Sequence, residues 1–202
     1  MDYVHHYDSP LGGITIASDG VALVGLWFDG QKHFPDPLVP GALAEGSAES
    51  DPPVSAQTDA WLDAYFAGSD PGPTPPLAPR GTAFRREVWE ILLQIPYGRT
   101  TTYGDIAARL ARRRGLGHFS AQAVGGAVGH NPISVIIPCH RVLGSDGSLT
   151  GYAGGLERKA ALLALERTGG MRSGAPLPEL PSHGGAGGTA RLSPPALVTH
   201  PA

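Results

Sequence analysis

The alternation of apolar and polar positions predicts β-structure in the first part of the chain. Residues 12–27 read GGITIASDGVALVGLW, so that two β-rich runs flank the tripeptide Ser18-Asp19-Gly20. Glycine reaches the positive φ angles of tight turns without strain, and this segment therefore predicts a β-hairpin. Residues 35–57 are mostly proline, glycine, alanine, serine and acidic residues, a composition that predicts a loop.

A helix is expected after this loop. The segment TDAWLDAYF, residues 58–66, places large apolar side chains at helical spacing behind Thr58, which we expect to be the N-cap. The next segment is DPGPTPPLAP, residues 70–79, where five of the ten residues are proline. Such a segment is stiff and extended, and we place a domain boundary in it.

Helical periodicity dominates the second half of the chain. Between residues 82 and 95 one helical face is apolar, formed by Phe84, Val88, Ile91, Leu92 and Ile95. Pro96-Tyr97-Gly98 ends that helix, and two shorter helices are expected after Thr102 and over residues 120–129. Short helices in this arrangement, with a tight turn and arginines between them, resemble a helix-turn-helix module.

The segment after these helices combines a strand, a loop and a final helix. Residues 133–137, ISVII, are interpreted as a buried strand that leads into PCHRV, and residues 156–167 as an amphipathic helix. The expected fold class is α+β, with a small N-terminal α/β domain and its proline-rich linker over residues 1–79. A mainly helical domain is expected over residues 80–168. Residues 169–202 are rich in glycine and proline without periodicity, and we expect them to be disordered.

The charge distribution is more informative than the total charge. Fifteen lysines and arginines against 18 acidic residues give a formal net charge of -3, which by itself argues mildly against a nucleic-acid partner. However, eight arginines lie between residues 80 and 114 against three acidic residues, a local balance of 8 − 3 = +5, whereas residues 1–79 are acidic. The sequence therefore predicts a basic face on one half of the molecule.

The cysteine content and the N-terminal segment indicate the cellular compartment of the protein. A single cysteine, Cys139, excludes an intramolecular disulfide. The start, MDYVHHYDSP, lacks the pattern of a signal peptide, and no apolar run approaches the roughly 20 residues of a membrane span. We expect a soluble, cytoplasmic protein that makes no membrane contact.

Cys139 admits three interpretations from the residues around it. A free cysteine is commonly an inert, buried packing residue. A structural zinc site is disfavoured because it needs about four cysteine or histidine ligands, and no second cysteine exists. A nucleophile is favoured by the position of Cys139 after a proline and beside His140, since an imidazole and a carboxylate promote thiolate formation. The packing and nucleophile interpretations both stay open at this level.

Three motifs, taken together with their spacing along the chain, resemble those of one known family. Asn131-Pro132, ISVIIPCHRV and TGYAGGLERKAALLALE are similar to segments of the O6-alkylguanine-DNA alkyltransferases, whose active-site signature is PCHRV. The resemblance runs from about residue 82 to residue 166. It continues more weakly into SPLGGITIASDGVALVGLWF, which resembles the family's ribonuclease H-like N-terminal domain.

The resemblance implies a DNA-repair reaction without a cofactor or metal. In this family an alkyl group moves irreversibly, in a single turnover, from O6-alkylguanine or O4-alkylthymine in duplex DNA to the protein's own cysteine. The damaged nucleotide is first flipped out of the duplex, because its reactive atom is inaccessible inside the base stack. The partner is therefore expected to be double-stranded DNA carrying the lesion, bound by a monomer.

Catalytic roles follow by resemblance, residue by residue. Cys139 matches the alkyl acceptor, and His140 matches the residue that draws off the thiol proton through a water. Glu166 matches the carboxylate that orients this histidine, and Asn131 the asparagine that braces the active-site turns. Tyr103 matches the tyrosine that helps rotate the nucleotide and donates a proton to the leaving guanine.

Substrate and DNA contacts are implied in the same way. The carbonyls of Cys139 and Val142 would face the guanine amine, and the loop of Tyr152, Ala153 and Gly154 would close the pocket. The residues expected at the DNA are Thr102, Ser120, Ala121, Gln122, Ala123, Gly125, Gly126, Arg141 and Ser145. The small residues of the helix expected over residues 120–129 suit a close approach to the minor groove, although by themselves they also suit a tightly packed core helix.

The chain departs from the family pattern at several positions. Gln122 stands where many members have an arginine that fills the gap left by the flipped base, and glutamine lacks that charge and planar fork. Ser134 replaces a proline of some relatives. A longer loop, RLARRRGLGHF, carries Arg112–Arg114, which either contact phosphates or lie on a solvated surface. The zinc ligands found in the N-terminal domains of some relatives are absent.

Two other functions remain as alternatives. The first is a non-catalytic, alkyltransferase-like protein that binds the lesion and flags it for other repair; such relatives have lost the reactive cysteine, which is present here. The second is a transcription regulator that only uses the helix-turn-helix. Such a regulator has no reason to keep Cys139, His140, Asn131 and Glu166 together.

Overall fold

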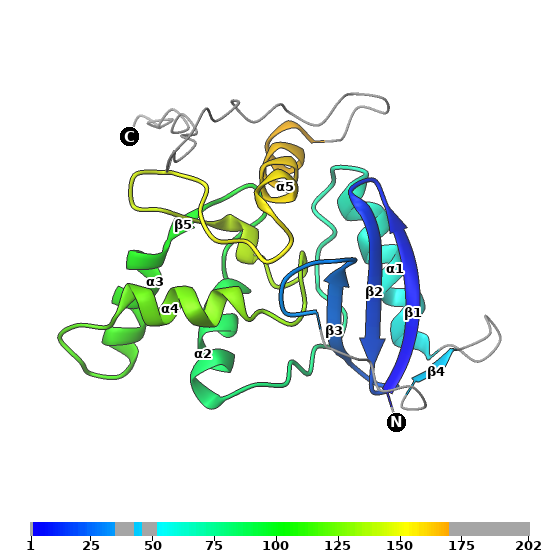
Figure 1. Cartoon of the computed structure of the whole chain (residues 1–202), viewed down its shortest axis with the longest axis horizontal. Coiled ribbons are helices and arrows are strands. Elements are labelled where there is room, and N and C mark those ends of the chain that lie inside the picture. Colours follow the sequence, from blue (N-terminus) through cyan, green and yellow to red (C-terminus); the bar gives the residue numbers. More distant parts are fainter. Residues whose placement is uncertain (1, 35–42, 46–51, 170–202) are drawn as a thin grey trace, which may run out of the picture.

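The computed structural model describes residues 2–34, 43–45 and 52–169, and its N-terminal part is built on a four-stranded sheet. The strand order is β3-β2-β1-β4, with the bounds β1 (Asp2–Ser9), β2 (Gly12–Ser18), β3 (Leu23–Phe28) and β4 (Leu43–Glu45) (Figure 1). β2 pairs antiparallel with β1 and β3, and β4 pairs parallel with β1. The hairpin predicted over residues 12–27 is confirmed as β2 and β3. The sequence pattern did not indicate β1, because aspartates and histidines interrupt its apolar positions.

Helix α1 begins earlier than the sequence predicted. It runs over Pro53–Phe66 and follows Pro52, so the predictions of a loop through residue 57 and of Thr58 as N-cap are wrong. A proline fits the first turn of a helix because its missing N–H needs no partner there. Thr58 lies inside the helix, where its hydroxyl donates to the Val54 carbonyl at 2.7 Å. β4 also interrupts the predicted loop, and the rest of that loop, apart from Pro52, lies outside the described residues.

Helix α1 lies against β1 and β2, and polar contacts help to hold it there (Figure 1). Nε2 of His5 lies 2.9 Å from the Asp59 carboxylate, and the Tyr7 hydroxyl donates to Asp63 at 2.8 Å. Trp61, Leu62, Tyr65 and Phe66 are buried, as the helical spacing predicted. This packing carries the face of α1 that bears Tyr65 toward the second half of the chain.

The outer edge of β3 is covered by two segments from later in the chain. In the linker, the Pro76 carbonyl accepts from the Leu23 N–H at 2.8 Å, and the Ala78 N–H donates to the Leu23 carbonyl at 2.7 Å. Further along the same strand, the Leu26 N–H donates to Pro132 and its carbonyl accepts from Ser134. An edge strand needs such partners for its free backbone groups. The second pairing places the segment before Cys139 directly against the sheet.

The predicted helices of the second half are confirmed, with ends that differ by a few residues. They are α2 (Ala83–Leu92), α3 (Tyr103–Arg113), α4 (Ala121–Gly129) and α5 (Leu156–Thr168). Thr82, Thr102 and Ser120 cap α2, α3 and α4 with their hydroxyl groups, and Thr102 forms a reciprocal capping box with Asp105. α2, α3 and α4 pack on one another. Two short parallel strands, β5 (Thr101–Thr102) and β6 (Val142–Leu143), connect this group to the active-site segment.

The strand predicted over residues 133–137 is wrong. These residues are buried but form consecutive turns, and only Ile133 makes a bridge, to Leu26. The Ile137 N–H donates back to the Ile133 carbonyl at 3.1 Å, and Val135 has a φ angle of 66°, a left-handed conformation that costs a β-branched residue free energy. The segment is apolar because it is buried, and a short apolar run also fits a buried strand, which is why the sequence pattern predicted one. Cys139–Arg141 then form a single turn of 3-10 helix.

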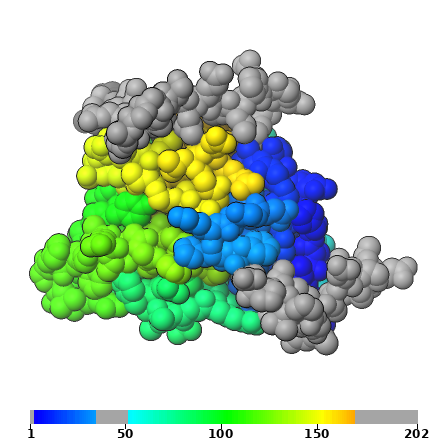
Figure 2. Space-filling view, in the orientation of Figure 1, coloured from blue at the N-terminus to red at the C-terminus, as the bar shows by residue number. Residues whose placement is uncertain are grey.

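One hydrophobic cluster joins the two halves of the molecule. It contains side chains from the sheet, from α1, and from the helices and turns of the second half. Phe28, Tyr65, Trp89, Ile137 and Leu162 belong to it and are almost completely buried. In the space-filling view β3 and the loop after it lie directly against the segment around residues 150–160 (Figure 2). No helix in the described part of the chain is long and apolar enough to cross a membrane.

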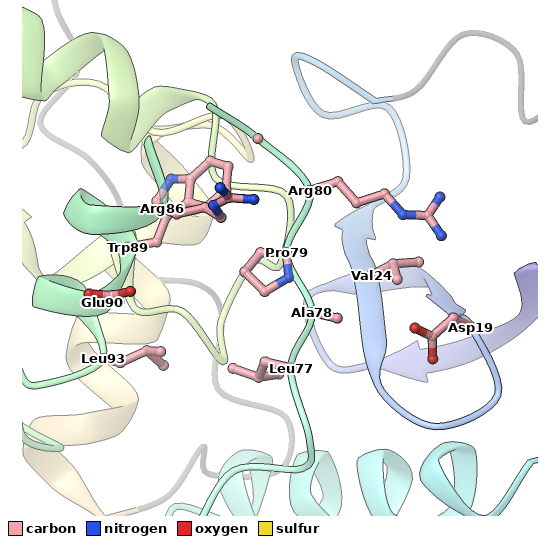
Figure 3. Close-up of a pocket in the computed structure, with 11 residues that line it drawn as sticks. Asp19, Val24, Leu77, Ala78, Pro79, Arg80, Arg86, Trp89, Glu90 and Leu93 are labelled. Atoms are coloured by element: carbon pink, nitrogen blue, oxygen red, sulfur yellow. The ribbon is translucent and has the colours of Figure 1, made fainter. Parts of the chain in front are cut away.

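A cavity of about 630 Å³ lies where the linker passes between the β2–β3 turn and α2 (Figure 3). Leu77 and Pro79 from the linker line it on one side, and Trp89 from α2 and Leu93, which directly follows α2, line it on the other. None of its lining residues is among those expected to react or to bind DNA. The functional site lies elsewhere, around Cys139.

Candidate active site

Cys139 is a buried thiol held at the start of a 3-10 turn. Only 4% of the surface of Cys139 is exposed. Pro138 precedes the turn, and the Cys139 N–H donates to the Ile137 carbonyl at 2.8 Å. The sulfur is therefore fixed in position by backbone on both sides.

Asn131 braces the turn that carries the thiol. Its Nδ2 group donates to the carbonyls of Ile133 and Ile137 at 3.2 and 2.8 Å and lies 3.1 Å from the Cys139 sulfur. Its Oδ1 atom accepts from the Ile133 N–H at 3.1 Å. These contacts satisfy backbone groups that no strand partner satisfies, which explains how a buried segment can leave regular secondary structure. They also aim a polar N–H at the sulfur.

His140 and Glu166 form a buried pair beside the thiol. His140 Nε2 lies 2.7 Å from Glu166 Oε1, and both side chains are almost completely buried. Because an ionised carboxylate can only accept, Nε2 must carry the proton of this hydrogen bond. Nδ1 is buried and has no hydrogen-bond partner within the described residues. The neutral ring therefore keeps a basic nitrogen available.

Glu166 accepts hydrogen bonds from four residues. Arg141 donates to it from Nε and Nη2 at 2.9 Å, the Gly98 N–H donates at 2.9 Å, and the Tyr65 hydroxyl donates at 2.8 Å. His140 is the fourth donor. Burial alone would raise the pKa of Glu166, but the hydrogen bonds and charges of His140 and Arg141 outweigh burial and lower the pKa to about 2. Glu166 is therefore a carboxylate throughout the physiological range.

Burial keeps His140 and Cys139 uncharged before the reaction. It lowers the pKa of His140, against the opposing effect of Glu166, so the imidazole is neutral at pH 7. It also raises the pKa of the Cys139 thiol, although the Asn131 amide and the Lys159 charge oppose this rise. The group at rest is a thiol that needs a base before it can attack.

Lys159 is a buried cation that the sequence reasoning did not identify. Its Nζ donates to the Val142 carbonyl at 2.5 Å and to the Thr150 carbonyl at 2.6 Å. Burial lowers the pKa of Lys159 to about 8, against the effect of Cys139. The helical spacing could have indicated that Lys159 is buried, because it lies four residues before Leu163 and seven before Glu166, on the buried face of α5.

The loop expected to close the pocket is held by the N-terminal half. The Lys32 N–H donates to the Ala153 carbonyl at 3.0 Å, and Gly154 lies so close to Phe28 and Tyr152 that a Cβ atom would crowd them. Arg158 donates to the carbonyls of Leu11 and Gly154, at 3.0 and 3.3 Å. On the opposite side, the Tyr103 hydroxyl donates to the carbonyls of Thr150 and Gly151, each at 3.2 Å. The structure thus brings Tyr103 to the same loop as Tyr152.

The expected DNA contacts divide into an exposed group and one buried exception. Ser120, Ala121, Gln122, Ala123, Gly126 and Ser145 are exposed, and Thr102 and Gly125 are half-buried. A Cβ atom at Gly126 would meet nothing within 4 Å, so internal packing does not require the small residue there. Arg141 is different: it is buried, and its Nη1 donates to the Ile95 carbonyl at 2.6 Å while Nε and Nη2 bind Glu166. The structure places this arginine in the interior of the protein, contrary to the expectation that its side chain lies at the DNA.

Comparison with known proteins identifies the family. The model of the 6-O-methylguanine DNA methyltransferase ribonuclease-like domain matches residues 3–77, and that of the 6-O-methylguanine DNA methyltransferase DNA-binding domain matches residues 83–168. A methylated-DNA–protein-cysteine methyltransferase of Haemophilus influenzae is 40% identical over 166 residues, which is 82% of this chain and 86% of that protein. A protein of the same name from Methanosarcina acetivorans is 42% identical over 165 residues, covering 81% of this chain and 97% of its own length.

A solved structure gives the same result. The crystal structure of Mycobacterium tuberculosis OGT in complex with DNA is 40% identical and matches with a TM-score of 0.68, covering 83% of this chain and 94% of that chain. Sequence and fold agree. The chain therefore belongs to the 6-O-methylguanine DNA methyltransferase family of DNA-repair alkyltransferases, and it has the two-part architecture of a ribonuclease-like domain and a DNA-binding domain.

Proposed function

We propose that Cys139 is the residue that accepts the alkyl group from O6-alkylguanine in double-stranded DNA. The observation that carries this assignment is the buried thiol beside Asn131 and the His140–Glu166 pair. A thiol in this setting has an oriented neutral base next to it and a fixed line of approach. O4-alkylthymine presents the same alkyl–oxygen bond and is included in the proposal.

The reaction transfers one proton and one alkyl group. Nδ1 of His140 takes the thiol proton through a water, while the Glu166 carboxylate stabilises the imidazolium that forms. The sulfur attacks the alkyl carbon, a carbon–sulfur bond forms, and the carbon–O6 bond breaks with its electron pair left on guanine. Tyr103 supplies a proton to the departing guanine, and the imidazolium then returns the proton of the thiol to the Tyr103 phenolate through solvent. The product thioether is stable, so each molecule reacts once.

The substrate pocket is assigned to the segments around this thiol. Tyr152, Ala153 and Gly154 close it, and the carbonyls of Cys139 and Val142 face the guanine amine. Lys159 already donates to the Val142 carbonyl, which leaves that oxygen one further lone pair for the base.

DNA binding is assigned to α3 and α4, used as a helix-turn-helix. The exposed small side chains at the start of α4 suit the floor of the minor groove, and the exposed Gln122 is assigned as the side chain that enters the duplex. Thr102 and Ser145 lie near enough to the surface to contact phosphates, whereas the buried Arg141 is left out of the proposed interface. We further propose a monomer as the active form and, because the relatives are named as DNA-alkyl acceptors, the cell interior as its place of action.

The end of α3 adds two cations to this interface, next to the loop that follows the helix. Arg114 is held by Glu87, to which Nε and Nη2 donate at 3.0 and 2.6 Å, and it lies over the rings of Phe84 and Phe119. Arg112 and Arg113 are exposed in the last turn of α3. We assign Arg114 the role of holding the loop, and Arg112 and Arg113 the role of phosphate contacts.

Mass spectrometry tests the assignment of Cys139. After incubation with duplex DNA containing O6-methylguanine, the peptide that bears Cys139 should gain the mass of one methyl group in exchange for a proton. Cys139→Ser should abolish this gain and keep binding to the damaged duplex. An unmodified peptide with tight lesion binding would instead support a non-catalytic lesion-binding protein.

A further inference from the structure

Tyr65 connects the N-terminal domain to the reacting groups of the other domain. It lies on α1, and its hydroxyl donates to Glu166 Oε1 at 2.8 Å. The same hydroxyl oxygen lies 3.3 Å from His140 Nε2. Tyr65 is completely buried, so no water competes for these contacts from bulk solvent. Cys139, His140 and Glu166 all come from the DNA-binding domain, and Tyr65 is the contribution of the ribonuclease-like domain to their cluster.

In its contact with Glu166, the Tyr65 hydroxyl is the proton donor. Burial raises the pKa of Tyr65 well above its ordinary value, and the Glu166 charge raises it further. Its single proton is directed at Oε1, so its oxygen lone pairs remain to accept. One of them faces Nε2, whose proton points at the same carboxylate oxygen. Tyr65 therefore favours the His140 tautomer with the proton on Nε2 and a basic Nδ1.

We propose that Tyr65 is a positioning residue for alkyl transfer, through which the N-terminal domain fixes the orientation and the basicity of the His140–Glu166 pair. This inference rests on the proposed role of Cys139 and His140. It gives the N-terminal domain a direct part in the chemistry, in addition to its packing contacts. A hydrogen bond donated to Glu166 spreads the carboxylate charge and weakens the pull of that charge on the imidazolium.

The other charged and titratable groups around His140 act in known directions. The Glu166 charge raises the His140 pKa, while the charges of Arg141 and Lys159 lower it. Tyr152 approaches His140 edge-on, with ring centroids 6.4 Å apart, and Cys139 precedes it in the chain. Loss of the Tyr65 hydroxyl removes its 2.8 Å hydrogen bond to Glu166 and so increases the effective charge of this carboxylate, which outweighs the loss of the longer, 3.3 Å contact to Nε2. The pKa of His140 should therefore rise when Tyr65 is replaced by phenylalanine.

A purely structural role for Tyr65 makes a different prediction. Its ring stacks on Trp61 at 5.4 Å and meets Phe66 and Tyr97 edge-on at 5.4 and 5.9 Å, so it also fills the core. Phenylalanine keeps this ring and removes only the hydroxyl. Tyr97→Phe is the matched control, because the Tyr97 hydroxyl is buried near the same cluster and has no hydrogen-bond partner within the described residues.

The experiment measures the rate of alkyl transfer from the free base O6-benzylguanine as a function of pH. This substrate reports on the thiol and its base without any contribution from DNA binding. For Tyr65→Phe we expect a rate at pH 7 that is lower by roughly tenfold or more, the effect of one hydrogen bond to a charged group. We also expect the acid side of the profile to move to higher pH by about half a unit or more, because a more basic His140 is protonated at higher pH. Tyr97→Phe should follow the wild-type profile.

The outcomes separate the inference from the function on which it rests. If the wild-type protein takes up no methyl group on Cys139 from duplex DNA containing O6-methylguanine, the proposed function fails before Tyr65 is tested. If wild type reacts and Tyr65→Phe shows the same rate and profile, the inference about Tyr65 is wrong. A thermal unfolding scan of each variant shows how much of each is folded, and an equal loss of rate at every pH would assign Tyr65 to packing alone.

Discussion

Arg141 and Glu166 form a two-point ion pair in the interior, with Nε 2.9 Å from Oε2 and Nη2 2.9 Å from Oε1. The arginine side chain is 9% exposed and the glutamate side chain 1%. A guanidinium matches a carboxylate in this geometry with two parallel hydrogen bonds, and Arg141 also donates to the Ile95 carbonyl. The residue that follows the proposed base is thus part of the frame that holds the carboxylate.

Removing Arg141 should cost substantial stability. Arg141→Ala leaves the Glu166 charge buried without its main cation, a change that typically costs about 3–5 kcal/mol. Arg141→Lys should recover only part of this, because an ammonium cannot make the same two-point contact. Urea unfolding measures the loss, and Arg167→Ala, at an exposed position of α5, the helix that carries Glu166, is the control. A stability close to wild type for Arg141→Ala would contradict the frame role.

Acid should destabilise the protein through Glu166. The pKa of Glu166 falls from 4.5 to about 2 in the folded protein. A group whose pKa is lower in the folded state stabilises folding above its unfolded value, and this contribution disappears as pH falls through the folded value. The unfolding temperature should therefore drop between pH 4.5 and pH 2. Glu166→Gln should be less stable at pH 7 and should show a smaller drop over this interval; equal slopes for the two proteins would assign the acid sensitivity to other carboxylates.

Gln122 should limit the rate on duplex DNA but not on a free base. Replacing it with arginine supplies a longer, charged side chain that can hydrogen-bond at the gap left by the flipped base. We expect Gln122→Arg to speed transfer from O6-methylguanine in a duplex several-fold and to leave transfer from free O6-benzylguanine unchanged. Comparing single-turnover rates on the two substrates tests this. A change on the free base would mean that residue 122 acts on the thiol site instead of on base flipping.

Arg112 and Arg113 should contribute to DNA affinity without affecting the chemistry. The double variant Arg112→Ala/Arg113→Ala removes two phosphate contacts, so the slope of log affinity against log salt should become shallower by about 1.8. The rate with free O6-benzylguanine should not change. Titrations of a labelled duplex at several salt concentrations measure the slope. An unchanged slope would show that these two side chains belong to a solvated loop.

The helices and the hairpin could be predicted from the sequence because their signals are local. Thr102 and Asp105 cap α3 within four residues of chain, and the apolar face of α2 repeats within one helix. Cys139, His140 and Glu166 could also be assigned before the structure, since the motif that carries them is continuous or follows at a fixed distance. The predicted roles of these residues stay proposals until the reactions above are measured.

Other features depend on contacts that no local pattern encodes. Residues 133–137 look like a strand, but the Asn131 side chain and the edge of β3 satisfy their backbone, so they fold as turns. Arg141 looks like a surface cation, yet a carboxylate 25 residues later draws it into the interior. By itself the sequence determined which groups could react. Tertiary packing decided which of them meet, because burial strengthens each polar contact and penalises each unpaired charge, and this selection brought Tyr65 from 101 residues away to Glu166.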